Sequence, residues 1–562
     1  MITYRARFLS VLSAIAAFTL LCQGASAVQL VSFNSAGNAT ANGESRSDVS
    51  VGGRLVSDDG QLVLIVSLAT DLVAGVTDGN GTNDVYLRNR TSGVTELISV
   101  VAGGTNPGTG TSDLPSISGD GRYVVFRSNV ANLVAADNNG TFDIFVRDRT
   151  AGTTALVSVN NAGTDSGSAA SDGWPLISQD GRYILFTSNA VDLVPTDTNG
   201  ESDVFMRDRV AGTTTLVSVN SAGNDPAESQ SILHCISPDG RYVVFSSSAT
   251  DLTADTDTNG GNDVFLRDTV AGTTTLISIN QGGTAAANNS SDGHFRCVTP
   301  DGRYVVFTSR ADDLTADTDT NNNQDVFRRD VTTGTTVLVS FNSAGTDTGD
   351  NWSRKGFVSI DGRFVAYEST ATNIVAGDSN GGRDIFIRDL EANSTIIASR
   401  NVAGTGTGDV GSEEHYVSAD GRFVVFESSA TDLTATNTGG NDYGYLFDRQ
   451  LGTLFCLGLK SDGTDTANDH VRDPWISRNG RWVLLNSRAT DNISVTDGNS
   501  ATDIVFFDNL AAIIPTAAGG GGGGGGICSV SSSAANYPLS FLAPFLLILA
   551  LSLLKRARVR QY

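Results

Sequence analysis

The feature that most constrains this chain is a unit of about 60 residues repeated eight times. An Asp-Gly pair, usually followed by Arg, recurs at intervals of 59 to 62 residues. The copies are Asp59-Gly60, Asp120-Gly121, Asp180-Gly181, Asp239-Gly240, Asp301-Gly302, Asp361-Gly362, Asp420-Gly421 and the variant Asn479-Gly480. Such a period indicates stacked copies of one supersecondary unit. The repeat fills most of the 562 residues, so we expect one repeat domain rather than the several separate domains that length alone would favour.

Each unit is predicted to contain four strands, which we term a to d. In the fourth unit, strand a covers 234–237, strand b 241–247, strand c 263–267 and strand d 274–280. An Asp-Gly pair between apolar runs is typical of a tight hairpin turn. Strand b is apolar on both faces, which fits blades that are stacked face to face rather than a sheet with one wet face.

The two ends of the repeat region complete each other. The eighth unit has a strand c at 503–507 but no strand d before the glycine-rich tail. The sequence Leu-Val-Ser-Phe-Asn-Ser-Ala-Gly occurs at 30–37 and again at 338–345, where it covers a strand d and its following loop. We therefore predict an all-β fold: an eight-bladed β-propeller of four-stranded blades, closed by the N-terminal strand, which completes the last blade and leaves no open edge.

The repeated motif resembles that of a known family. Ser-Pro-Asp-Gly-Arg-Tyr-Val-Val-Phe at 237–245 is similar to the repeat of TolB-type β-propellers. The resemblance implies a propeller used for protein interaction in the cell envelope. The units here are longer than those of that family, and the surplus lies in the b–c and d–a loops, so family function transfers only weakly.

The N-terminus is typical of an exported protein. Arg5 and Arg7 precede an apolar run at 8–21, and Ala25-Ser26-Ala27 supplies the small residues of a cleavage site. Residues 1–27 are therefore predicted to be a secretory signal peptide, and the propeller is predicted to span 28–510.

The C-terminus is predicted to hold the protein at the cell surface. We expect a Gly-rich linker at 511–536, a transmembrane or sorting helix at 537–554 and a basic cytoplasmic tail at 555–562. This order resembles bacterial GlyGly-type sorting tails, which would imply cleavage of the tail, with Cys528 as a processing or lipid-attachment position. A permanent membrane anchor is the alternative.

Charge and cysteine content limit the partners. The net charge is −24, which repels phosphate backbones, so we expect no nucleic-acid partner and a monomeric protein. Outside the two terminal segments the cysteines are Cys235, Cys297 and Cys456, an odd and sparse set. Cys235 and Cys297 share one strand-a position in adjacent units. Because the repeat points them the same way, we expect buried thiols, with a disulfide as the alternative.

Residues that recur in every unit are interpreted as structural. The Arg after the Asp-Gly turn and the Arg-Asp pair at the end of strand c are expected to form ion pairs that fix the turns. They include Arg122, Arg182, Arg241, Arg303, Arg363, Arg422 and Arg481, and the pairs Arg147-Asp148, Arg207-Asp208, Arg267-Asp268 and Arg388-Asp389.

The b–c loops carry a pattern of oxygen ligands. Units four and five read D-x-D-x-N-x-x-x-D, with side-chain oxygens at the positions that a calcium loop uses. The predicted calcium ligands are Asp255, Asp257, Asn259 and Asp263 in unit four, and Asp317, Asp319, Asn321 and Asp325 in unit five. Such loops resemble the calcium loops of integrin-type propellers. The alternative is that Asp, Asn and Gly make good turns through side-chain hydrogen bonds.

Five other units keep part of this set and lack its first Asp. They contribute Asp78, Asn80 and Asp84; Asp137, Asn139 and Asp143; Asp197, Asn199 and Asp203; Asp378, Asn380 and Asp384; and Asp497, Asn499 and Asp503. Unit seven, at 436–442, has lost the pattern.

Residues that depart from the repeat are the better candidates for binding. Strand a starts on the face from which both long loops emerge, and the residues there vary. We predict that Arg54, Trp174, His234, Arg296, His415 and Trp475 form a protein- or polysaccharide-binding site at the mouth of the central channel. Ordinary loop variation is the alternative.

No catalytic pattern is present in the sequence. The four histidines are scattered, and there is no P-loop, His-x-x-x-His or Cys-x-x-Cys motif, nor a G-x-S-x-G elbow between a strand and a helix. We therefore predict a non-enzymatic binding scaffold, exported to the cell envelope. The alternatives are a calcium-dependent adhesive or structural surface protein and, less favoured, a propeller-type hydrolase or lyase.

Overall fold

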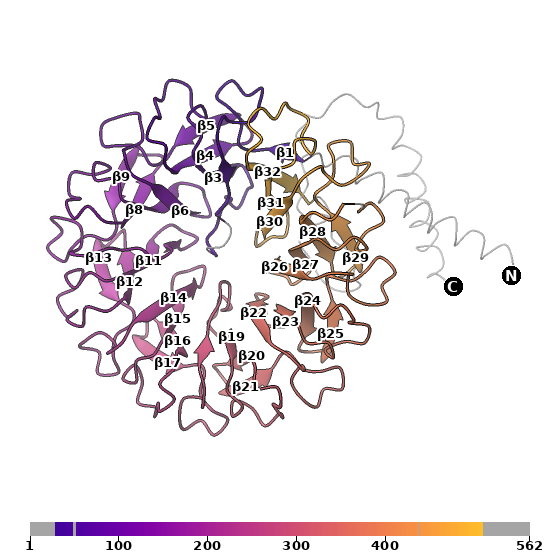
Figure 1. The fold of residues 1–562 in the computed structure, drawn as a ribbon. Helices are drawn as coiled ribbons and strands as arrows, with labels where there is room; N and C mark the ends of the chain where they lie inside the picture. The colour runs from indigo at the N-terminus through magenta and orange to yellow at the C-terminus, as the bar shows by residue number, and fades with distance from the viewer. Residues whose placement is uncertain (1–27, 49–51, 438, 510–562) are drawn as a thin grey trace, which may run out of the picture. The chain divides into compact units, whose positions relative to one another are not determined.

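The described residues form a ring of eight four-stranded blades. The computed structural model describes residues 28–48, 52–437 and 439–509, which contain 32 β-strands and no α-helix. The blades follow one another around a common axis (Figure 1). Six of them are separate four-stranded sheets, and blades seven and eight are joined into one sheet by a single parallel pair, Tyr443 with Val471. The predicted all-β, eight-bladed propeller is confirmed.

Within each blade the strands follow in chain order from a, nearest the axis, to d. Blades one to four contain β2 (Ser45–Arg46), β3 (Leu62–Ser67), β4 (Asp84–Asn89) and β5 (Val94–Leu97); β6 (Ser112–Ile117), β7 (Tyr123–Ser128), β8 (Asp143–Asp148) and β9 (Thr153–Leu156); β10 (Leu176–Ile177), β11 (Tyr183–Ser188), β12 (Asp203–Asp208) and β13 (Thr213–Leu216); and β14 (Ser231–Ile236), β15 (Tyr242–Ser247), β16 (Asp263–Asp268) and β17 (Thr273–Leu276).

The second half repeats this order, and its last blade takes a strand from the N-terminus. Blades five to eight contain β18 (Ser291–Asp292), β19 (Tyr304–Ser309), β20 (Asp325–Asp330) and β21 (Thr335–Leu338); β22 (Ser353–Val358), β23 (Phe364–Ser369), β24 (Asp384–Asp389) and β25 (Ser394–Ile397); β26 (Ser412–Val417), β27 (Phe423–Ser428), β28 (Tyr443–Asp448) and β29 (Thr453–Cys456); and β30 (Val471–Ile476), β31 (Trp482–Ser487), β32 (Asp503–Asp508) and β1 (Gln29–Leu30).

The ring is closed as the sequence predicts. β1 pairs antiparallel with β32, with Gln29 opposite Phe506 and Leu30 opposite Val505. Beyond β1, the Ser32 hydroxyl donates a 2.7 Å hydrogen bond to the Asp503 carboxylate. The N-terminal segment therefore occupies the strand-d position of blade eight.

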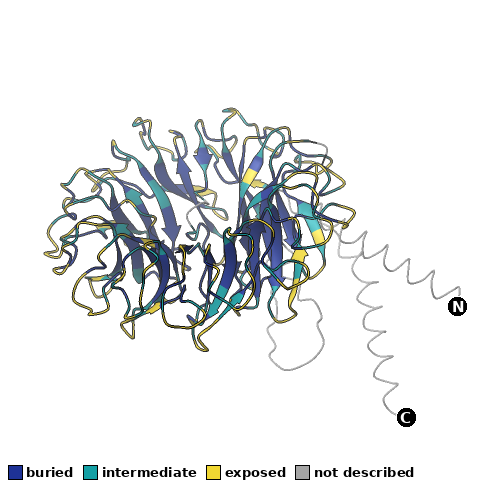
Figure 2. Cartoon of the chain, turned by 60° about the horizontal axis from the view of Figure 1, so that its bottom comes forward, coloured by how far each residue is buried: buried dark blue, intermediate teal, exposed yellow. Residues whose placement is uncertain are grey.

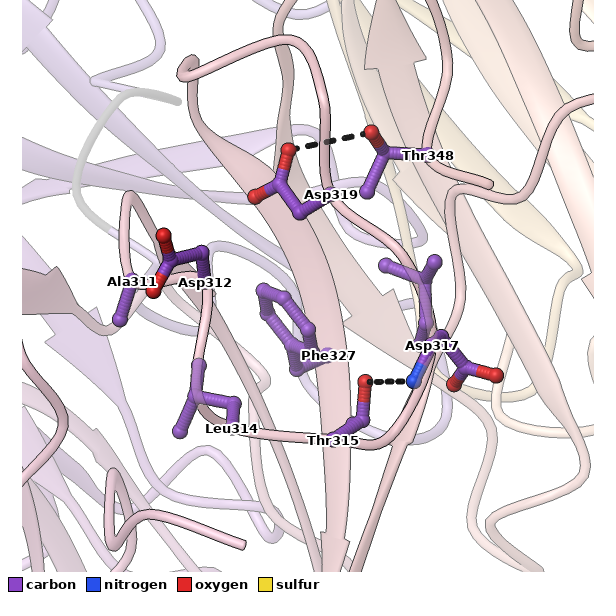
Figure 3. A pocket seen from close by; sticks show the side chains of 9 residues that line it. Ala311, Asp312, Leu314, Thr315, Asp317, Asp319, Phe327 and Thr348 are labelled. Atoms are coloured by element: carbon purple, nitrogen blue, oxygen red, sulfur yellow. Dashed lines mark hydrogen bonds between the residues drawn. The ribbon is translucent and has the colours of Figure 1, made fainter. Parts of the chain in front are cut away.

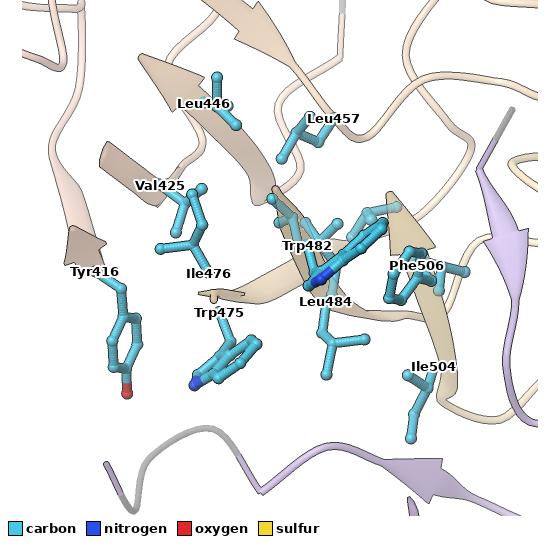
Figure 4. Close-up of a cluster of buried hydrophobic side chains, with 14 of the residues drawn as sticks. Tyr416, Val425, Leu446, Leu457, Trp475, Ile476, Trp482, Leu484, Ile504 and Phe506 are labelled. Atoms are coloured by element: carbon cyan, nitrogen blue, oxygen red, sulfur yellow. The ribbon is translucent and has the colours of Figure 1, made fainter. Parts of the chain in front are cut away.

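Strands b and c supply most of the core, because they are buried on both faces (Figure 2). In most blades one aromatic ring of strand b stacks on one of strand c, for example Phe245 on Phe265 with ring centroids 5.6 Å apart. In blade eight Trp482 and Phe506 take these positions, and Trp475 of the inner strand is fully buried beside them (Figure 4).

The predicted ion pair between the Arg after the turn and the Asp that ends strand c is confirmed in seven blades, whereas the strand-c Arg before that Asp bonds to a Thr hydroxyl of strand d, for example Arg267 to Thr274. The Arg after each Asp-Gly turn donates to the last Asp of strand c, for example Arg241 to Asp268 at 2.7 Å. The other pairs are Arg122–Asp148, Arg182–Asp208, Arg303–Asp330, Arg363–Asp389, Arg422–Asp448 and Arg481–Asp508. In blade one, Gln61 and Asn89 replace both partners.

A belt of main-chain hydrogen bonds joins neighbouring a–b turns. Asp58 N donates to Gly119 O, Gly119 N to Gln179 O and Gln179 N to Pro238 O, at 2.8–2.9 Å. The same bonds run from Ile360 through Ala419 to Arg478. Proline lacks the N–H, so Pro238 and Pro300 cannot continue this belt between blades four, five and six.

A disulfide joins blades four and five at this interruption. Cys235 and Cys297 are bonded, with their Cα atoms 6.3 Å apart. The expectation of two free thiols is wrong, because the inner strands of adjacent blades converge towards the axis and two equivalent positions come within bonding distance. Cys456 is a free, buried cysteine.

Several predictions concern residues that the structure does not describe. The signal peptide, the Gly-rich linker, the helix at 537–554, the basic tail and Cys528 lie outside the described residues. Within the described part of the chain, no helix has the length and hydropathy needed to cross a membrane.

Candidate functional site

The b–c and d–a loops emerge together on one side of the ring, which we call the long-loop face. The a–b and c–d turns form the opposite, short-turn face. In seven blades an Asn of the b–c loop ties the two long loops together. Asn259, for example, donates from Nδ2 to Ala287 O in the d–a loop and accepts from the backbone N–H of Gly261. The equivalent residues are Asn80, Asn139, Asn199, Asn321, Asn380 and Asn499.

The first residue of strand c is a buried Asp in the same seven blades. Asp263 is fully buried, and its Oδ1 accepts a 2.6 Å hydrogen bond from Ser278 of the d–a loop. Its Oδ2 accepts from Asn259 at 2.8 Å. Burial raises the pKa of this carboxyl to about 7. The pKa is also raised to about 7 in Asp84, Asp143, Asp203, Asp325 and Asp503, and to about 8 in Asp384.

Blade seven replaces both partners of this pair together. Tyr443 stands where the other blades have Asp, and Gly458 stands where they have Ser. The Tyr443 hydroxyl donates to Ala467 O at 2.7 Å, and a Cβ at Gly458 would lie 2.5 Å from the Tyr443 ring. The Tyr443 ring therefore leaves room only for glycine at position 458. Because both positions change together in this blade, the Asp and Ser of the other blades are interpreted as one packed pair.

The predicted calcium ligands lie in these loops, and calcium binding stays a prediction. Asp257 Oδ2 is buried without a hydrogen-bond partner, which fits a cation nearby. The amide of Asn259, by contrast, already bonds within the loop, which fits turn chemistry. Asp255 lies two residues before Asp257 in the same b–c loop. The predicted ligands of unit five occupy the equivalent positions of their own b–c loop.

The loop of unit five borders a hollow just large enough for one water molecule, about 10 Å³. Asp312, Asp317 and Asp319 line it, but their carboxylates point in different directions (Figure 3). Asp319 accepts a hydrogen bond from Thr348, and Asp325 accepts one from Asn321. Across the described residues, no group of three His, Cys, Asp or Glu side chains is arranged to hold a metal ion.

Charged side chains gather where the inner strands begin, near the long-loop face. They come from the second to fourth positions of strand a, or from strand b opposite them. We call them the mouth residues: Asp113, Arg127, His234, Asp292, His294, Arg354, Lys355, Glu368, Glu413, Glu414, Glu427 and Asp473.

The mouth residues link neighbouring blades. Lys355 of blade six pairs with Glu414 of blade seven at 2.6 Å and lies 3.7 Å from the buried Glu368. Glu427 of blade seven accepts the backbone N–H of Asp473 in blade eight, and burial raises its pKa to about 7. The carboxylates of Asp292, Glu413 and Glu414 are about half exposed, and each also pairs with a basic side chain.

His234 and Trp174 lie in or beside this set. His234 is buried, and its Nε2 faces both the Ser246 hydroxyl at 2.9 Å and the Asp292 carboxylate at 3.1 Å. Trp174 is 43% exposed and packs against Phe295, with ring centroids 5.2 Å apart. Trp174 thus presents a partly exposed aromatic ring in contact with the residue three positions after Asp292.

His415 and Trp475 are buried in the ring interior rather than exposed at the mouth. His415 is 1% exposed and meets the edge of Phe357 at 5.0 Å. Burial, followed by the charge of Lys355, lowers its pKa to about 3, so it is neutral at pH 7. Trp475 is also 1% exposed. These two residues fill the core, and sequence position alone did not separate them from exposed ones.

Arg54 and Arg296 lie near the opposite end of the axis. The Arg296 guanidinium reaches across the ring and donates to Val417 O and Ile476 O, where the inner strands of blades seven and eight lead into their a–b turns. Arg54 pairs with Asp58 of an a–b turn at 3.6 Å. Units one and five have extra residues between the start of strand a and the a–b turn, and Arg54 and Arg296 lie in these longer stretches, away from the mouth.

The Ser246, His234 and Asp292 side chains do not form a catalytic relay. A relay needs the carboxylate on one ring nitrogen of the histidine and the hydroxyl on the other. Here both groups face Nε2. Nearby, burial lowers the pKa of His294 to about 4, and its Nε2 lies 3.0 Å from the Thr308 hydroxyl.

Comparison with known proteins identifies no family. No protein-family model matches the chain, and no curated protein matches it. Solved structures similar to it include an oligogalacturonate lyase from Vibrio parahaemolyticus, with 12% identity over 83% of this chain and 91% of that one and a TM-score of 0.42. TolB from Acinetobacter baumannii has 15% identity over 70% and 78%, with a TM-score of 0.29. The propeller domain of the Trilobed protease from Pyrococcus furiosus has 12% identity over 71% and 92%, with a TM-score of 0.35.

These neighbours bear on two predictions from the sequence. TolB structures are among them, so a TolB-like propeller fold is supported, although the likeness concerns the fold alone. The prediction that the chain is not an enzyme is contradicted, because lyases and peptidases are among the similar propellers. The absence of a familiar catalytic motif was too weak a basis for excluding activity on this fold.

Proposed function

We propose that this chain is an exported propeller of the bacterial cell envelope that binds a glycan at the mouth residues and Trp174. The observation that carries the proposal is the concentration of non-repeating charged side chains at one end of the axis. Elsewhere the ring repeats the same ion pairs, loop ties and core rings, so these side chains are not needed to build a blade.

The chemistry of the site favours a glycan over a flat protein surface. Sugar rings present C–H faces that pack on an exposed aromatic ring such as Trp174, while their hydroxyls bond to carboxylates such as Asp292 and Glu414. An aromatic anchor with a few convergent polar groups is typical of a ligand site. Attachment to the cell surface is a proposal from the terminal segments, and the disulfide supports export because such bonds persist in oxidising compartments.

The proposal is tested by binding to an array of defined oligosaccharides, followed by calorimetry with the sugars that bind. We expect Trp174→Ala to weaken binding at least tenfold, or about 1.4 kcal/mol, and Asp292→Asn to weaken it as well. Val270→Ala, in an exposed c–d turn on the opposite face, is the control and should bind as the wild type does.

Two outcomes would overturn the proposal. One is that no sugar binds while a peptide array gives binding that depends on Trp174, which would favour a protein partner. The other is sugar binding that Trp174→Ala leaves unchanged while the variant stays folded. Product formation is measured in the same samples, so that turnover of a bound sugar is recorded.

A further inference from the structure

Three arginine side chains gather at the short-turn end of the ring axis. They are Arg54 of unit one, Arg296 of unit five and Arg478 in the a–b turn of blade eight. Arg296 reaches this end because its guanidinium donates to Val417 O at 3.2 Å and Ile476 O at 2.9 Å. Three blades that are distant in sequence therefore bring like charges together.

The three charges are close enough to repel one another. Burial lowers the pKa of Arg296 to about 9, with further lowering from the charges of Arg478 and Arg54. Burial and the charge of Arg54 lower the pKa of Arg478 to about 10. Gathering half-buried cations in this way is unfavourable unless an anion lies among them.

The protein supplies too little negative charge at this end. Asp58 is the ion-pair partner of Arg54, but the Oδ1 to Nη1 distance of 3.6 Å is too long for a hydrogen bond. Asp58 Oδ2 instead accepts from the Gln179 amide at 2.9 Å. Arg54 Nη1 is buried and has no hydrogen-bond partner.

The other two guanidiniums are not neutralised either. Arg296 bonds to neutral carbonyl oxygens, and among the described residues no carboxylate lies within ion-pair distance of Arg478, although the nearby charge of Asp58 acts to raise its pKa. This deficit stands out in a chain with 61 acidic and 37 basic residues. Positive charge is therefore concentrated at one point of an otherwise acidic protein.

We propose that the arginine cluster of Arg54, Arg296 and Arg478 binds a small oxyanion, the group shared by carboxylates, phosphate and sulfate. The planar N–H forks of guanidinium groups match such oxygens in pairs. Arg54 and Arg478 supply the free donors, and Arg296 adds charge while its own donors hold blades seven and eight. The site lies at the other end of the axis from the mouth residues and does not depend on the proposed glycan binding.

The test compares sodium sulfate, phosphate and acetate with sodium chloride at equal ionic strength, using the purified protein. An anion at a hundredfold excess over its Kd should raise the unfolding midpoint by about 3 °C, and calorimetry should show saturable binding. Arg54→Gln combined with Arg478→Gln should remove both effects. Arg310→Gln, which removes one exposed positive charge elsewhere, should retain them. The order of affinity among the three anions identifies the class of ligand.

A general salt effect would look different. Sulfate stabilises many proteins by exclusion from their surface, and such a shift would be equal in the wild type and the double variant. That result, or the absence of saturable binding to the wild type, would overturn the proposal. If the double variant does not fold, Arg478→Gln alone serves, because the main-chain carbonyl of Arg478 accepts from Ala419 N while its side chain forms no hydrogen bond or ion pair with the described residues. This single variant should weaken anion binding at least tenfold.

Discussion

The buried Asp–Ser pairs predict that stability falls as pH rises from about 4 to about 7. An Asp in an unfolded chain has a pKa near 3.9, and burial raises that of Asp263 to about 7. Between these values the folded protein holds one proton that the unfolded chain has lost. Unfolding therefore releases a proton, and the free energy of unfolding decreases by about 1.4 kcal/mol per pH unit for this group. The stabilisation is complete below pH 4 and lost above pH 7.

Asp263→Asn isolates this contribution. The amide occupies the place of a protonated carboxyl and does not titrate. The variant should therefore lack the part of the pH dependence of the free energy of unfolding that comes from this one proton. Urea unfolding between pH 4.5 and 7.5, followed by tryptophan fluorescence, should give a slope against pH that is less steep by about 1.4 kcal/mol per unit. Summed from pH 4.5 to pH 7.5, the difference in the free energy of unfolding is about 3 kcal/mol.

The control for this experiment is Asp225→Asn, which changes an exposed carboxylate in a d–a loop and should leave the slope unchanged. Equal slopes for Asp263→Asn and the wild type would refute the reasoning, because the carboxyl would then be ionised in the folded protein throughout the window. The other six pairs act in the same direction, so the wild-type slope should exceed that of a single group.

Three further predictions concern the ties between and within blades. Arg422→Ala should cost about 3–5 kcal/mol and Arg241→Ala less than about 1 kcal/mol in urea unfolding, because only the first pair is buried, with side chains 8% and 0% exposed; equal costs would contradict this. Reduction of the disulfide, which closes a loop of 62 residues, should lower the free energy of unfolding by about 4 kcal/mol, and alkylation before and after reduction should count the thiols. Millimolar calcium should raise the unfolding midpoint relative to EDTA, and Asp257→Ala with Asp319→Ala should remove the shift, whereas coincident curves would assign these loops to turn chemistry.

The fold was accessible from the sequence because the repeat encodes it locally. The Asp-Gly turn at 239–240 and the doubly apolar strand after it predict the blade, and the matching sequences at 30–37 and 338–345 predict the closure. The strand-a boundary was less accurate: β14 begins at Ser231 rather than at His234. Its start is set by pairing with Ser247, which the local pattern does not reveal.

The candidate sites were harder to predict, because they depend on the radial position of each residue. His415 and Arg296 lie on inner strands like His234, yet one is buried in the interior and the other reaches the short-turn face. The direction of each side chain depends on the insertions in units one and five and on the bulges in the inner strands. The repeat period of the sequence does not reveal these local irregularities. Arg478 was missed because it stands in a turn position whose equivalents elsewhere are uncharged or acidic. Its positive charge, at a turn position that carries none in the other units of this acidic chain, is the signal that could have identified Arg478 from the sequence.

The pairing of β1 with β32 determines when the protein can finish folding. Ser32 and Asp503 are 471 positions apart, so the contact that closes the ring forms only after nearly the whole chain has been made. Contacts over such separations form late, and until then an unpaired strand edge is exposed to other chains. A chain that ends before β32 could still form the first seven blades, but β1 would have no strand to pair with and the ring would stay open. Because the chain is made from its N-terminus, β1 stays unpaired until β32 has been made, and in this interval the exposed strand edge leaves the protein most prone to aggregation or chaperone binding.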